Sequence, residues 1–187
     1  MNSFRLLLIS ALVLLMTGCG ALKAPAYSPD YQALDSLKNK KLVNVSVAQV
    51  EPRNPKHEVN IIPLRAMSLV AEQGTFSAYL ESALIEDLSQ MGVYQADSDI
   101  QISVVLVENN IDISSFSTGV GKIVINLEIL KSESPTFQKE YVATTEFESS
   151  FAGAVAIPKA QTEYPFLVRT VLKQVYSDPE FIKELSL

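Results

Sequence analysis

The feature that most constrains this chain is an uncharged apolar run that ends just before its single cysteine. Residues 6–16 (LLLISALVLLM) carry no charge, and a short basic segment, residues 1–5, precedes them. A membrane-spanning helix needs about 20 apolar residues, so this run is too short to span a bilayer by itself. A basic start, a short apolar run and small residues after it are typical of a secretory signal peptide. Here the small residues are Thr17 and Gly18, directly before Cys19.

The sequence Met16-Thr17-Gly18-Cys19 resembles the lipobox of bacterial lipoproteins, with Met16 where leucine is commonest. The resemblance implies that Cys19 is diacylated, becomes the first residue after cleavage and receives a third acyl chain on its amine. Stable anchoring takes two membrane signals, so three acyl chains would hold the protein permanently. Gly20 stands where enteric lipoproteins retained in the inner membrane have Asp, which implies the periplasmic face of the outer membrane. An ordinary secretory signal with a chance cysteine is the alternative.

Cysteine use and charge exclude several classes of function. Acylation of Cys19 would leave no thiol in the mature chain, which removes disulfides, thiol catalysis and cysteine metal sites. The full chain has a net charge of −6, and loss of the signal peptide with Arg5 leaves −7. An acidic domain repels phosphate backbones and anionic headgroups, so we expect no nucleic-acid partner.

The composition along the chain predicts three segments. We expect a lipoprotein signal peptide over residues 1–18, a lipidated cysteine with a flexible tether over 19–40, and a single α+β periplasmic domain over 41–187. Pro25 and Pro29, in a mostly small and polar context, indicate the tether. Whether Tyr27 and Tyr31 dock on the domain stays open at this point.

Hydrophobic periodicity predicts the elements of the domain. In order, they are strands over 42–50 and 59–62, a helix capped by Thr75 and stopped by Gly92, strands over 100–113, 122–130 and 140–151, a helix over 160–176, and a short helix after Asp178-Pro179. This β-α-β-β-β-α order, with one extra short strand, predicts an α+β two-layer sandwich. An antiparallel sheet of about four strands would carry two helices on one face.

The lipobox, this order and the C-terminal sequence LVRTVLKQVYSDPEFIKEL (residues 167–185) resemble the YajG-like family of uncharacterised bacterial lipoproteins. The resemblance covers most of the mature chain and implies a small periplasmic α/β lipoprotein. It brings no catalytic residues with it.

A search for chemistry finds no convincing catalytic or metal-binding motif. The single histidine, His57, has no G-x-S-x-G partner motif, and zinc would need several His or Cys ligands. Asp97 and Asp99 lack the spacing of a calcium loop, and Gly119 and Gly121 fit a hairpin turn rather than a phosphate loop. We therefore expect neither an enzyme nor a cofactor.

Two apolar segments are candidates for contact with a partner, a membrane or a ligand. Phe116, in a loop of small residues, is the candidate partner or membrane contact, unless it folds back onto the core. Residues 151–157 (FAGAVAI) would line a groove or form a tightly packed crossing.

The sequence thus predicts a membrane-anchored, non-catalytic accessory or scaffold in an envelope complex. The alternative is a carrier or chaperone for lipid or another apolar ligand in a groove between helices and sheet. A large enclosed apolar cavity would favour the carrier, and a filled core with an exposed apolar patch would favour docking.

Overall fold

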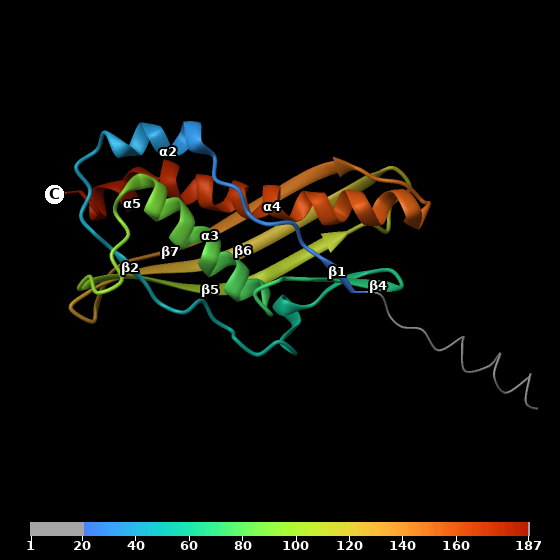
Figure 1. Cartoon of the computed structure of the whole chain (residues 1–187), viewed down its shortest axis with the longest axis horizontal. Coiled ribbons are helices and arrows are strands. Elements are labelled where there is room, and N and C mark those ends of the chain that lie inside the picture. The colour runs from blue at the N-terminus through green and yellow to red at the C-terminus, as the bar shows by residue number, and fades with distance from the viewer. Residues whose placement is uncertain (1–20, 187) are drawn as a thin grey trace, which may run out of the picture.

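The computed structural model describes residues 21–186 (Figure 1). The predicted signal peptide, lipobox and Cys19 lie outside the described residues. The described elements are β1 (Ala21–Lys23), α2 (Tyr31–Lys38), β2 (Ser46–Val47), η2 (Glu58–Asn60), β3 (Ile62–Leu64), β4 (Met67–Val70), α3 (Phe76–Met91), β5 (Ile100–Asp112), β6 (Thr118–Lys131), β7 (Ser134–Glu148), α4 (Gly153–Ser177) and α5 (Pro179–Glu184). Across residues 21–186 no helix is long and apolar enough to cross a membrane.

The main sheet has four strands in the order β2-β5-β6-β7. The three long strands are antiparallel neighbours, as their alternating apolar residues and short connections predict, and β2 pairs in parallel with β5. A second sheet of three short strands has the order β1-β4-β3. The predicted α+β two-layer arrangement is confirmed, with α3 and α4 across one face of the main sheet (Figure 1).

Helix α3 begins and ends where the sequence predicts. The Thr75 hydroxyl accepts a hydrogen bond from the Ala78 amide at 3.1 Å, which caps the first turn. Gly92 ends the helix in the left-handed region at a φ of 76°, a conformation that glycine adopts without steric cost.

Apolar side chains fill the space between the helices and the main sheet. Tyr164 of α4 lies at its centre, with its ring 4.6 Å from that of Phe76 and 5.2 Å from that of Tyr79. Fully buried residues of β5, β6, β7, α3 and α4 belong to the same core: Ile102, Leu106, Ile123, Ile125, Leu127, Ile129, Ala143, Leu80, Leu84, Leu88, Leu167, Val168 and Val171.

Residues 21–40 are not a flexible tether, so this part of the predicted domain organisation is wrong. Helix α2 packs on the domain with Leu34 and Leu37, which are buried and lie three residues apart on one helix face. Before it, the extended chain is held by the Tyr79 hydroxyl, which donates to the Pro25 carbonyl at 2.8 Å, and by the Tyr27 hydroxyl. The prolines keep this segment extended along the helices instead of loosening it.

Other predicted boundaries change because of pairing partners far along the chain. The predicted strand over 42–50 forms a ladder only at β2 and otherwise makes isolated bridges, and residues 58–64 divide into η2 and β3.

Gly119 and Gly121 lie within β6, not in the turn. A Cβ on Gly119 would lie 2.3 Å from the Phe147 ring, so the glycine admits that ring across the strands. Helix α4 begins at Gly153, seven residues before its predicted start.

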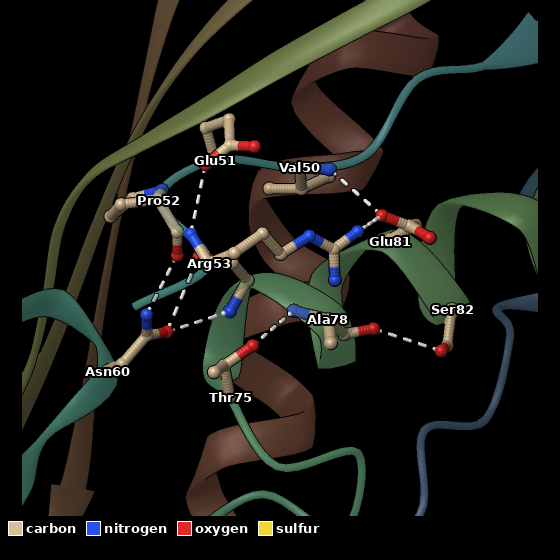
Figure 2. A network of polar contacts seen from close by, with 10 residues as sticks. Val50, Glu51, Pro52, Arg53, Asn60, Thr75, Ala78, Glu81 and Ser82 are labelled. Atoms are coloured by element: carbon tan, nitrogen blue, oxygen red, sulfur yellow. Dashed lines mark hydrogen bonds and ion pairs between the residues drawn. The ribbon is translucent and has the colours of Figure 1, made fainter. Parts of the chain in front are cut away.

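A network of polar contacts holds residues 50–60, which run from the end of β2 through η2, against the first turns of α3 (Figure 2). Arg53 pairs with Glu81 of α3, and the same carboxylate accepts a hydrogen bond from the Val50 amide at 2.9 Å. The side-chain amide of Asn60 donates to two carbonyl oxygens of its own loop at 2.8 and 3.0 Å, and its oxygen accepts from the Ser77 amide at 3.0 Å. These contacts satisfy backbone groups that would otherwise be buried without partners, which indicates a structural role.

Candidate functional site

Two exposed phenylalanines form a patch that we call the aromatic tip. Phe116 lies in the β5–β6 connection and Phe151 lies between β7 and α4. Their rings stack with centroids 5.4 Å apart, yet 77% of Phe116 and 70% of Phe151 remain exposed to solvent. The predicted contact residue Phe116 therefore does not fold back onto the core. Aromatic side chains clustered on a surface commonly mark an interaction site.

Arg65 holds the aromatic tip in place from the β3–β4 turn. It occupies the left-handed region at a φ of 59°, and its guanidinium lies 6.0 Å from the centre of the Phe151 ring. The guanidinium donates to the carbonyl oxygens of Phe151, Ser150 and Ile113, the last two at 3.0 Å. One side chain thus ties together three connections that are distant in the sequence.

The β5–β6 connection and the start of α4, next to which the aromatic tip lies, are at the same end of the domain as β1 and β4 (Figure 1). Strand β1 runs parallel to β4, with Ala21 opposite Ser68, and Leu64 lies opposite Met67 across the β3–β4 turn. Ala21 is therefore the residue of β1 nearest to the turn that Arg65 occupies.

The face of the main sheet opposite α3 and α4 carries a second apolar surface, which we call the open face. Val105 and Val107 of β5 and Val142 of β7 are each 43–44% exposed there. Val124 of β6, which is 6% exposed, lies directly opposite Val142 of β7 and, on its other side, opposite Glu108 of β5. We call these four valines the strip. An ion pair between Lys122 and Glu108, with N and O 2.6 Å apart, borders the strip.

A shallow hollow of about 320 Å³ lies between the η2 segment and β5. Ile61 and Val107 are the exposed apolar residues that line it, together with Glu58, Val59, Glu108, Asn109 and Asn110. Acidic and amide side chains among its lining residues make the hollow poorly suited to an apolar ligand.

A buried carboxylate fastens the N-terminal segment to the helices. Asp87 of α3 is 1% exposed and accepts a hydrogen bond from the Tyr27 hydroxyl at 2.7 Å. Burial raises the pKa of Asp87 to about 6, although the hydroxyls of Tyr27 and Tyr176 oppose that rise. Burial, followed by the charge of Asp87, raises the pKa of Tyr27 far above its usual range, so its hydroxyl stays a donor.

The remaining sequence candidates do not converge on a chemical site. His57 caps η2, because its ring nitrogen accepts from the Val59 amide, and Asp97 accepts from the Gln95 side chain at 2.9 Å within their own loop. Within residues 21–186 no three His, Cys, Asp or Glu side chains are grouped so that they could hold a metal ion. Cys19, Met16, Thr17 and Gly18 lie outside the described residues.

Sequence reasoning missed Arg65 as part of the aromatic tip, and it treated Phe151 only as the start of an apolar segment. An arginine in a two-residue turn gives no local signal, since its three acceptors are contributed by other connections.

Comparisons with known proteins bear on the fold. No model of a known protein family matches the chain, and no curated protein matches it. A crystal structure of a Xanthomonas campestris protein, described under the family model DUF330, is 13% identical with a TM-score of 0.54, over 84% of this chain and 95% of that one. The likeness is one of fold. A crystal structure of a candidate lipoprotein from Caulobacter crescentus is 9% identical with a TM-score of 0.49, over 82% of this chain and 96% of that one.

Proposed function

We propose that this chain is a lipoprotein held by acylated Cys19 on the periplasmic face of the outer membrane, where it acts as a non-catalytic accessory in an envelope complex. Its open face would bind an envelope protein. The observation that carries this proposal is a contrast between the two faces of the main sheet. The helix-covered face is packed with buried side chains, whereas valines stay exposed across the opposite face.

The packing between helices and sheet favours docking over transport of an apolar ligand. A carrier needs an enclosed apolar cavity of roughly 300–1,000 Å³. At the place where such a cavity would lie, Tyr164, Leu167 and Val168 of α4 are fully buried against the strands. The hollow between η2 and β5 has polar lining residues instead. This arrangement supports the accessory role over the carrier alternative.

The open face has the composition of a protein interface. Its centre is the strip of Val105, Val107, Val124 and Val142, and charged residues such as the Lys122–Glu108 pair lie beside it. Interfaces commonly have an apolar centre depleted of charge and a polar rim. A partner strip of apolar residues would suit this surface.

Site-specific photo-crosslinking in living cells tests this proposal. A photoreactive amino acid replaces Val142 on the open face, and a matched control replaces Ser82, which is exposed on the outer side of α3. We expect one dominant envelope protein crosslinked from position 142, little from position 82, and loss of the adduct when Cys19→Ala removes the anchor. Absence of a consistent protein adduct, with stoichiometric lipid in the purified protein, would contradict docking and support the carrier.

A further inference from the structure

We propose that the aromatic tip inserts into the head-group region of the same bilayer that holds the acyl chains of Cys19. The domain would then lie on the membrane in one orientation, with the Phe116 end down and the β6–β7 turn away from the bilayer. This inference rests on the proposed lipid anchor and adds a second contact with the membrane.

The length of chain between the anchor and the fold carries the first step. Only Gly20 separates Cys19 from Ala21, which already pairs with Ser68 in the β1–β4 ladder. An extended chain spans at most about 3.6 Å per residue, so the Cα atoms of Cys19 and Ala21 lie within about 7 Å of each other. An acylated Cys19 therefore brings the start of β1 to the bilayer surface.

The direction of β1 carries the second step. From Ala21 to Lys23 the strand runs away from the β3–β4 turn, so Ala21, the described residue nearest in sequence to Cys19, lies at the end of β1 closest to Arg65. Ser68 lies three residues from Arg65, about 10 Å along a strand. The hydrogen bonds of Arg65 to Phe151 and to the Ile113 end of β5 place the aromatic tip on that same side.

The chemistry of the aromatic tip fits a membrane interface. Phe116 and Phe151 present two rings to solvent, and Val155, in the first turn of α4, is also exposed. Phenylalanine and aliphatic side chains on a polar scaffold bury themselves at the boundary between headgroups and acyl chains. The cation of Arg65 is exposed beside the Phe151 ring, where it can meet a lipid phosphate. The short chain from Cys19 keeps the aromatic tip next to the bilayer. Lipid is therefore a nearer binding partner for the tip than another protein.

Fluorescence quenching by lipid-borne nitroxides tests the orientation with the full lipidated protein. An acylated Cys19 leaves no reactive thiol, so Ser115→Cys beside Phe116 and Glu133→Cys in the β6–β7 turn each give one labelling site for an environment-sensitive dye. The length of β5, about 40 Å, separates these two ends. In vesicles of phosphatidylethanolamine and phosphatidylglycerol, we expect a shift to shorter wavelength and strong quenching at position 115 and neither at position 133.

Two sets of variants in the Ser115→Cys protein separate membrane contact from a change of fold. The double substitution Phe116→Ser, Phe151→Ser should abolish most of the quenching. The matched control Phe166→Ser, at a phenylalanine that is 53% exposed farther along α4, should leave the quenching unchanged. Quenching that survives the double substitution would overturn the proposal.

The mass of the purified protein separates failure of the inference from failure of the anchor. An acylated Cys19 together with an unquenched dye at position 115 would refute the aromatic-tip contact alone. An unacylated Cys19 would refute the anchor, and the aromatic-tip contact would fall with it.

Discussion

The substitution Asp87→Asn should remove a pH-dependent part of the free energy of unfolding. Asp87 is buried among α3, α4 and the N-terminal segment, next to the hydroxyls of Tyr27 and Tyr176. The charged groups that face it are Glu86, which raises its pKa, and Arg169, which lowers it. Desolvation outweighs the hydroxyls and the arginine, so the folded protein favours the neutral acid.

The direction and size of the change in unfolding free energy follow from the difference in the pKa of Asp87 between the folded and unfolded states. The pKa rises from 3.8, the ordinary value, to about 6 in the folded protein. The folded state therefore holds its proton more tightly than the unfolded state. This contribution to stability is fully present below pH 3.8 and is lost as the pH rises through about 6. At about 1.36 kcal/mol per unit of pKa, the loss is about 3 kcal/mol.

Urea denaturation between about pH 4 and pH 8 measures this effect, with the difference between wild type and Asp87→Asn isolating the contribution of Asp87. Both proteins are produced from Gly20 onward, without the signal peptide and Cys19, so that they stay soluble. Over that range the wild type should lose up to about 3 kcal/mol relative to the variant. Carboxylates whose pKa is lowered, such as Asp178 and Glu184, act in the opposite direction at lower pH and cancel in the difference. Parallel pH profiles for the two proteins would refute the reasoning.

Three further substitutions test the packing of the same chain by urea denaturation. Leu34→Ala should lower the free energy of unfolding by about 2–5 kcal/mol, because α2 is part of the core. The exposed neighbour Tyr31 is the control, and an equal effect of Tyr31→Ala would argue against that packing. Asn60→Ala should cost about 3 kcal/mol, since three hydrogen bonds are lost and the Ser77 amide is left unsatisfied. Thr75→Ala should cost about 1 kcal/mol through loss of the α3 cap, and an unchanged midpoint would contradict that role.

Local patterns predicted the elements whose residues specify their own structure. Helix α3 has its cap at Thr75, its stop at Gly92 and its apolar stripe within one stretch of sequence, so its bounds are close to the prediction. The three long strands likewise alternate over most of their length, although β6 and β7 begin four and six residues earlier than predicted. Helix packing on one face follows from these stripes.

The features that sequence patterns missed depend on partners far along the chain. Residues 21–23 form a strand because they pair with the edge of β4, 47 residues later in the sequence. Helix α2 is stabilised because Leu34 and Leu37 are buried in the core. The aromatic tip needs Arg65 in a turn that nothing local distinguishes. A proline-containing, mostly polar segment therefore reads as a tether until its long-range contacts are known.

The most direct test of the account is intact-mass analysis of the protein purified from the membrane fraction of its host cells. The account predicts a chain that begins at Cys19 and carries acyl groups on that residue. A mature chain with an unmodified Cys19, recovered in the soluble fraction, would contradict it.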